Sequence, residues 1–255
     1  ELAERAYESE NHEQALELSS QSWALSKEIE DQEIEARASI IIVQVIFLFA
    51  DSTEKYQQVL VTAQQTVALA QEIGNLKIGA QALSVMALAV NKLAASTDEY
   101  RQVFALAQRS LFLARESEDK ETETIALILM AQSAMRTAES KEDYEQIIQY
   151  ANEALGISNE LESSKYLAAA LSVLAKAHNK IENYVQVLDY AQQGLRLLQE
   201  LNDKTVEIEL LFLIVFANQK IASSTEAYQR TLQWAQQGLL LSQELQNQEF
   251  EAGFL

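Results

Sequence analysis

The sequence predicts an all-α protein, a solenoid built from stacked antiparallel helix pairs. The chain of 255 residues contains no proline and only 6 glycines, so it nearly lacks the two residues that break helices. Its apolar residues recur three and four positions apart, as on one buried face of a helix. The same pattern returns along the chain every 40 or 44 residues.

Aromatic residues mark this repeat. Tyrosines recur at spacings of 44, 44, 40 and 44, and a histidine lies 44 residues before the first of them. Ala-Gln-Gln-Gly-Leu follows two of these tyrosines at the same distance, at Ala191 and Ala235. We therefore expect about six repeats, whose second helices begin near His12, Tyr56, Tyr100, Tyr144, Tyr184 and Tyr228.

Each repeat is expected to form two helices, here called helix A and helix B. A more apolar segment precedes each tyrosine and predicts A helices over 32–50, 76–94, 120–138, 164–181 and 203–222. The segments that contain the marker residues predict B helices over 11–29, 53–73, 97–117, 141–161, 183–201 and 225–245. Ser96 is a natural N-cap and forms a capping box with Glu99. A single pair cannot bury its apolar face, so the pairs must stack.

The charge balance restricts the partners. With 19 Lys and Arg against 38 Asp and Glu, the net charge is −19, which repels nucleic acid and anionic membranes. The most apolar run, residues 40–49, is shorter than the ~20 residues that a membrane span needs. The absence of cysteine fits a reducing compartment such as the cytoplasm. We therefore expect a cytoplasmic protein with neither nucleic acid nor membrane as a partner.

One repeat carries a family resemblance. The segment from Leu174 to Leu195 resembles the tetratricopeptide repeat: Leu174-Ala175 replaces Leu-Gly, Tyr184 matches the tyrosine of the second helix, and Ala191 matches a small residue of its buried stripe. The repeats here are longer than the usual ~34 residues and lack the terminal proline. The resemblance implies a right-handed superhelix with the A helices along a concave groove.

Both ends fall within a helix A. Leu2-Ala3 aligns with Leu174-Ala175, and residues 248–255 align with 204–211. Solenoids normally end in capping repeats with a polar outer face, which neither end provides. We expect residues 1–255 to be one tetratricopeptide-like solenoid, a piece of a longer array.

Sites for catalysis are not apparent in the sequence. It has no glycine-rich phosphate loop, no His-Glu-x-x-His and no calcium loop. Its two histidines, His12 and His178, occupy packing positions of the repeat. We expect no enzyme activity, no cofactor and no metal.

One set of residues is a candidate binding site. Four consecutive repeats carry a cation at one position of helix A: Lys92, Arg136, Lys180 and Lys220. The resemblance implies that this helix face lines a groove that holds peptides, often acidic ones. The predicted groove residues are Gln44, Leu48, Leu88, Asn91, Lys92, Gln132, Met135, Arg136, Lys176, Asn179, Lys180, Phe216, Gln219 and Lys220. Alternatively, the cations only offset the helix dipoles, because each lies near a helix C-terminus.

Two functions stay open at this point. The first is a scaffold that binds a protein or peptide, including an acidic extended segment, in the groove. The second is a sensor or regulatory array of a larger signalling protein with an ATPase, kinase or protease effector. In that case its partners include other domains of the same chain.

Overall fold

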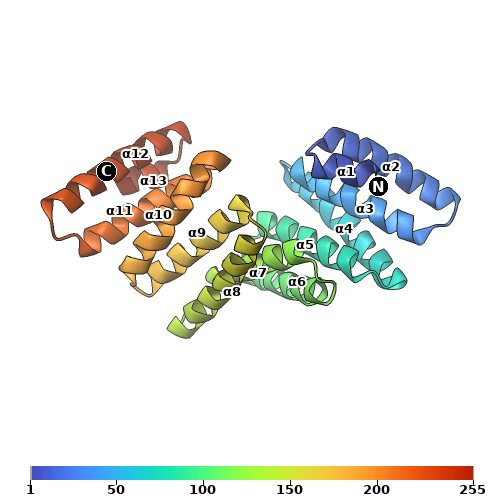
Figure 1. Cartoon of the computed structure of the whole chain (residues 1–255), viewed down its shortest axis with the longest axis horizontal. Helices are drawn as coiled ribbons and strands as arrows, with labels where there is room; N and C mark the ends of the chain where they lie inside the picture. Colours follow the sequence, from blue (N-terminus) through green and yellow to red (C-terminus); the bar gives the residue numbers. More distant parts are fainter. Residues whose placement is uncertain (1, 255) are drawn as a thin grey trace. The chain divides into compact units, whose positions relative to one another are not determined.

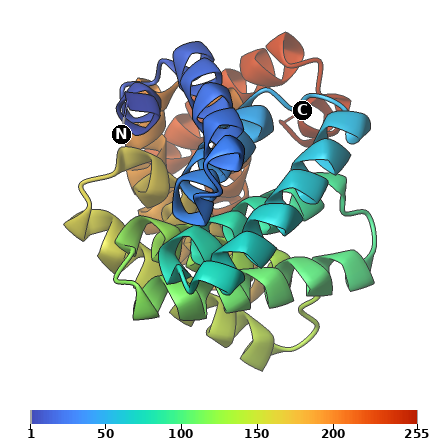
Figure 2. The same cartoon turned by 90° about the vertical axis from the view of Figure 1, so that its right-hand side faces the viewer.

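The computed structural model describes residues 2–254, with all of their side chains except those of residues 199 and 200 (Figure 1). These residues form thirteen helices and no strand, and their ribbons are helical throughout (Figure 1, Figure 2). The helices are α1 (Leu2–Glu8), α2 (His12–Glu28), α3 (Gln32–Leu48), α4 (Thr53–Ile73), α5 (Leu76–Leu93), α6 (Thr97–Glu116), α7 (Lys120–Met135), α8 (Lys141–Glu160), α9 (Ser164–Lys180), α10 (Tyr184–Leu201), α11 (Lys204–Ile221), α12 (Thr225–Glu244) and α13 (Gln248–Phe254).

The all-α class and the helix pairs are confirmed. The odd-numbered helices are the A helices and the even-numbered ones the B helices, and every predicted boundary lies within three residues of the observed one. Serine side chains accept a hydrogen bond at the starts of α4, α6, α8 and α12, and Ser96 forms the expected capping box with Glu99. The right-handed superhelix stays a prediction.

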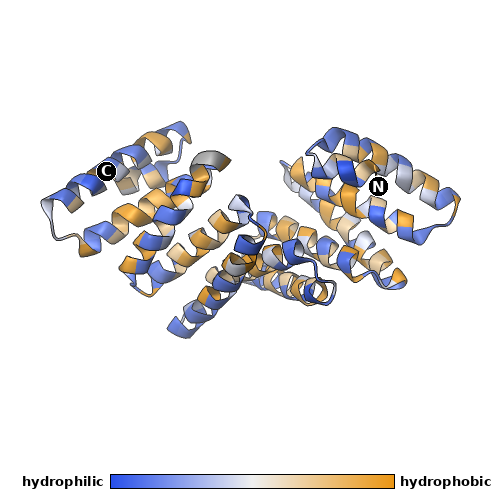
Figure 3. Ribbon diagram, viewed as in Figure 1, coloured by the Kyte–Doolittle hydropathy of each residue, from blue (hydrophilic) through white to orange (hydrophobic). Residues whose placement is uncertain are grey.

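The chain divides into two compact units, Glu1–Thr137 with α1 to α7 and Ala138–Leu255 with α8 to α13. Within each unit every helix packs on the next one, and each A helix also contacts the next A helix. Among the residues that the structure describes, no B helix contacts another B helix in this way. The A helices therefore form the more buried layer, and apolar residues cover much of their length, above all in α11 (Figure 3). The continuous solenoid over 1–255 stays a prediction.

Small residues let the B helices approach the A helices closely. Ala63, Ala107 and Ala191 occupy one repeat position and are fully buried. At Gly238 an added Cβ would lie only 2.2 Å from the ring of Phe254. The repeated small residues therefore set how closely the helices can pack.

The marker tyrosines fasten the turn from helix A to helix B. In three repeats the phenol hydroxyl donates a hydrogen bond to the carbonyl six residues earlier, at the end of helix A. These bonds run from Tyr100 to Ala94 (3.1 Å), from Tyr144 to Ala138 (3.4 Å) and from Tyr228 to Ala222 (2.9 Å). His12 packs between the rings of Tyr7 and Phe49 instead.

The opposite turns, from helix B to the next helix A, share a left-handed residue. These residues are Glu30, Gly74, Glu118, Glu162, Asn202 and Gln246. In five of these turns a Schellman hydrogen bond closes the turn, as from the Asn75 N–H to the Ala70 carbonyl (2.9 Å). At the sixth, the Asn202 N–H donates to the Leu198 carbonyl (3.0 Å). The sequence analysis missed this feature, because only one of the six residues is glycine.

Replacing Ala191 tests whether stability is local. Ala191 is fully buried in the core of the second unit, so Ala191→Leu should overpack that core and cost about 1–3 kcal/mol. Hydrogen exchange should rise mainly in residues 164–245, because repeats contact only their neighbours. Gln193→Leu at an exposed site of the same helix is the control. A uniform loss of protection over 11–245 would contradict local stability.

Alanine substitutions at two glycines distinguish the cost of backbone strain from the cost of packing. A Cβ at Gly74 or at Gly156 would meet no atom within 4 Å, but only Gly74 has a positive φ, of 70°. Gly74→Ala should therefore cost about 1 kcal/mol through left-handed strain. Gly156→Ala, within α8, should instead stabilise the protein by about 0.5–1 kcal/mol. Urea denaturation measures the change in the free energy of unfolding for both variants. Changes of the same sign in the two variants would contradict this account of the turn.

Candidate functional site

The predicted groove residues lie on the accessible stripe of the A helices. Eight of them are half-buried, and the other six are exposed, namely Leu48, Lys92, Arg136, Lys180, Gln219 and Lys220. Within a unit, this stripe is the part of each A helix that neighbouring helices leave uncovered. None of the fourteen side chains is fully buried, and their role as a groove stays a prediction.

The four cations that recur at one position of helix A, here called the cation column, have different surroundings. Lys92, Lys180 and Lys220 lie in the last turn of their helices, and Arg136 is the C-cap of α7. The Arg136 guanidinium lies 5.7 Å from the Tyr100 ring centroid. Lys220 Nζ lies 5.1 Å from the ring centroid of Phe216. All four positions suit both the helix-dipole and the ligand interpretation.

One predicted groove residue has a partner that the sequence analysis did not foresee. Lys176 Nζ on α9 forms an ion pair with Glu209 Oε2 on α11, at 2.6 Å. The acid does not recur at this position in the neighbouring repeats, where Gln81, Ile125 and Ala169 stand. The repeat pattern therefore gave no sign of this pair, which ties two successive A helices together.

The first unit contains a cavity of about 530 Å³. Its walls come from four successive A helices, α1, α3, α5 and α7, and from the N-cap residues Asn75 and Asp119. Of the predicted groove residues, Gln44 is the one that lines it. The cavity follows α3 over residues 33–44 and reaches only the N-terminal parts of α5 and α7, whereas Lys92 and Arg136 lie at helix C-termini.

The lining of this cavity combines an apolar floor with a charged rim. Ile40, Ile41 and Ile78 are each only 5% exposed and form the floor. The carboxylates of the lining are Glu4, Glu8, Glu33, Asp119 and Glu121, and the cations are Arg37 and Lys77. The sequence analysis missed these charged residues. A column of Glu33, Lys77 and Glu121 at spacings of 44 was the signal that could have found them.

Polar contacts join the walls of the cavity. Arg37 on α3 donates hydrogen bonds to both carboxylate oxygens of Glu4 on α1, each 2.8 Å long. The Asn75 side chain donates to Glu33 (3.1 Å), which connects α5 to α3. Gln81 on α5 donates to Asp119 at the start of α7 (3.0 Å). Each pair of neighbouring A helices in the first unit is thus bridged at the cavity.

The two outer walls also interact electrostatically. Burial raises the pKa of the Tyr7 phenol on α1, and the negative charge of Glu121 on α7 raises it further. Tyr7 and Glu121 come from the first and the last A helix of the unit, and both line the cavity.

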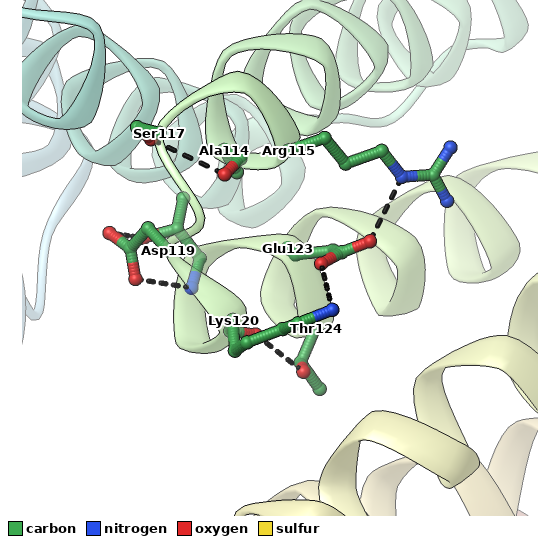
Figure 4. Close-up of polar contacts among 8 residues, drawn as sticks. Ala114, Arg115, Ser117, Asp119, Lys120, Glu123 and Thr124 are labelled. Atoms are coloured by element: carbon green, nitrogen blue, oxygen red, sulfur yellow. Dashed lines mark hydrogen bonds and ion pairs between the residues drawn. The ribbon is translucent and has the colours of Figure 1, made fainter.

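A buried carboxylate outside the cavity has a structural role. Glu123 Oε1 accepts a hydrogen bond from Arg115 Nε (2.9 Å), and its other oxygen lies 3.2 Å from Lys120 Nζ (Figure 4). The same position pairs Lys27 with Glu35 in an earlier repeat. Because the pair recurs between the end of helix B and the start of helix A, it belongs to the repeat and not to a binding site.

Neither histidine belongs to a reactive cluster. The ring of His178 stacks on Tyr190 with centroids 5.4 Å apart. In residues 2–254, no group of three or more His, Cys, Asp or Glu side chains could hold a metal ion. No described helix combines the length and apolar character that a membrane crossing requires.

Comparison with known proteins supports the fold. No protein-family model matches the chain, and no curated protein matches it in sequence. A solved structure from Pyrococcus horikoshii, a signal transduction ATPase with numerous domains and a tetratricopeptide repeat sensor, is similar with a TM-score of 0.67 and 14% identity. The similarity covers 98% of this chain and 36% of that one. This chain has a tetratricopeptide-repeat-like fold.

Two further structures are more distant. The TPR2AB-domain:pHSP90 complex of yeast Sti1 has a TM-score of 0.37 and 14% identity, and covers 99% of this chain and 94% of its own. A circular tandem repeat protein with novel repeat topology has a TM-score of 0.35 and 15% identity, over 99% and 73% of the two chains. The tetratricopeptide-like fold rests on the ATPase, of which this chain spans about a third.

His178 should make stability depend on pH. Burial lowers its pKa below the ordinary 6.5, so the unfolded chain binds a proton more readily than the folded one. The contribution of neutral His178 to the free energy of unfolding is fully present above pH 6.5. It is lost as the pH falls through the pKa of His178 in the folded protein. His178→Phe keeps a ring against Tyr190 and should lose less unfolding free energy between pH 7.5 and 5.5. Parallel pH profiles of the two proteins would contradict this.

Proposed function

We propose that this chain binds an extended protein or peptide segment on the accessible face of its A helices. The observation that carries the proposal is the 530 Å³ cavity whose walls come from four successive A helices. Its volume falls within the roughly 300–1,000 Å³ of ligand pockets, which also combine apolar surface with a few placed polar groups. A chain segment can fill it with side chains and place its backbone amides against the polar rim.

Helix spacing fits an extended ligand. Neighbouring helices pack about 8–10 Å apart, and an extended chain advances about 3.3 Å per residue. One repeat therefore corresponds to about three ligand residues. A segment that crosses the A helices of one unit would present every third side chain to the same position of successive repeats.

The cation column refines this proposal for the C-terminal halves of the A helices. Lys92 and Arg136 in the first unit, like Lys180 and Lys220 in the second, are exposed and suit an acidic extended segment. Each exposed pair contributes about 0.2–1 kcal/mol, so several pairs in register would set direction and association rate more than affinity. Lys176 should contribute less to binding an acidic segment, because it already forms an ion pair with Glu209.

A second function is a sensor or regulatory array within a larger protein. It is motivated by the likeness to the P. horikoshii ATPase, whose tetratricopeptide repeats are described as its sensor. In this role the A-helix face would bind a trigger or another domain of the same polypeptide. The reading frame on either side of residues 1–255 distinguishes the two functions, since an adjoining effector domain favours the sensor.

Charge reversal tests the cation column. Lys92→Glu with Arg136→Glu should weaken binding of a fluorescein-labelled peptide that has glutamate at every third position and leucine between. We expect an affinity loss of about 2- to 30-fold at 50 mM salt, from two exposed pairs, and a smaller loss at 200 mM. Fluorescence anisotropy measures the affinity.

The matched control changes the same number of charges elsewhere. Arg101→Glu with Arg109→Glu reverses two exposed cations of the B helix α6 and should leave the affinity nearly unchanged. Equal affinity losses in both double variants would mean that the peptide responds only to net charge. In that case the column cations serve only the helix ends.

A further inference from the structure

We propose that the cavity of the first unit selects a basic segment, with two cationic residues about six positions apart and an acidic residue midway. This inference rests on the proposed function, because it assumes that the A-helix face binds an extended chain. This basic ligand differs from the acidic ligand proposed for the cation column, since the cavity lies at the N-terminal parts of α5 and α7, whereas Lys92 and Arg136 lie at their C-termini.

The net charge of the cavity lining predicts the sign of the charge on the ligand. Five carboxylates and two cations line the cavity, so its net charge is 2 − 5 = −3. Arg37 is already bound by both oxygens of Glu4, and an incoming anion would have to displace that carboxylate. Lys77 is exposed and forms no ion pair with any residue that the structure describes. A cationic ligand therefore meets attraction chiefly at the exposed Glu8, Glu33 and Glu121.

Helix dipoles explain only part of this acidity. Glu33 and Glu121 lie in the first turns of α3 and α7, where carboxylates are favourable with or without a ligand. Glu8 is the last residue of α1, and a carboxylate at a helix C-terminus opposes the dipole. The cavity thus gathers negative charge from both kinds of helix end.

Three charged residues define the spacing. Glu33, Lys77 and Glu121 are each the second residue of their helix, in α3, α5 and α7, and all three are exposed. At about three ligand residues per repeat, the complementary segment reads base, two residues, acid, two residues, base. A uniformly basic segment should therefore bind less tightly, because Lys77 repels a cation at the middle position.

The remaining lining suits long basic side chains. Lysine and arginine have aliphatic stems that cover apolar surface while the charged head stays polar, and the floor of Ile40, Ile41 and Ile78 offers such surface. The ring of Tyr7, half-buried on α1, can receive a guanidinium on its face. The bridges between neighbouring A helices hold the walls apart before a ligand arrives, which lowers the entropy cost of binding.

Three labelled peptides, each measured against the whole 255-residue chain, test which sign and which spacing of ligand charges the cavity prefers. The first is Lys-Ala-Leu-Asp-Ala-Leu-Lys, the second is its charge inversion Glu-Ala-Leu-Lys-Ala-Leu-Glu, and the third is a scramble, Lys-Lys-Ala-Leu-Ala-Leu-Asp. Anisotropy at 50 mM salt should show the first binding about tenfold or more tightly than the second, from three pairs of changed sign. The scramble should bind more weakly than the first.

Variants locate the effect. Glu33→Gln with Glu121→Gln removes two carboxylates but keeps groups that can accept hydrogen bonds, and should lower affinity for the first peptide by about 2- to 30-fold. The control Glu72→Gln with Glu116→Gln removes two exposed carboxylates from B helices and should leave it unchanged. Lys77→Glu should shift the preference to Lys-Ala-Leu-Lys-Ala-Leu-Lys. Circular dichroism checks that each variant keeps its helix content.

The outcomes separate the two proposals. Equal binding of the first peptide and the scramble, or equal losses in both double glutamine variants, would overturn the selective cavity. Preferential binding of the inverted peptide, lost on reversal of Lys92 and Arg136, would overturn it while the proposed function stands. If none of these peptides binds the chain at any salt concentration, both proposals fail.

Discussion

Helices α3, α5 and α11 each pack against four other helices, and this burial determines the rest of the architecture. Helix α5, for example, contacts α3, α4, α6 and α7, so ten of its residues are buried. What stays accessible is a narrow stripe that includes Lys77, Gln81, Leu88 and Lys92. Because equivalent residues of successive repeats take equivalent places, any functional face must be built from columns along these stripes.

The direction of the A helices gives the stripes a charge polarity. Acidic residues such as Glu33 and Glu121 stand near helix N-termini, and cations such as Lys92 and Arg136 stand near C-termini. Each placement offsets a helix dipole by a few tenths of a kcal/mol. Fold stability alone therefore favours carboxylates and cations at these positions, whether or not a ligand binds there.

The sequence predicted the helices well because their signals are local. Apolar periodicity and the repeat spacing predicted each boundary to within three residues, and Ser96 marked the start of α6. Part of the cavity rim, the column of Glu33, Lys77 and Glu121, follows the repeat spacing. The bridges of the cavity could not be predicted, since they join residues such as Glu4 and Arg37 that obey no repeat spacing. The family resemblance also directed attention to the C-terminal halves of the A helices. The left-handed turns were missed because five of the six residues, such as Glu118, are not glycine.

Regular repetition and a specific site make opposite demands on sequence. The packing positions can be copied, as the buried Ala63 and Ala107 show, because every repeat meets the same neighbours. The bridges at the cavity differ from one repeat boundary to the next: Glu4 to Arg37, Glu33 to Asn75, and Gln81 to Asp119. A bridge that need not recur is free to vary without loss of the fold. Departures from the repeat on an accessible stripe are therefore where selectivity for a partner can be encoded.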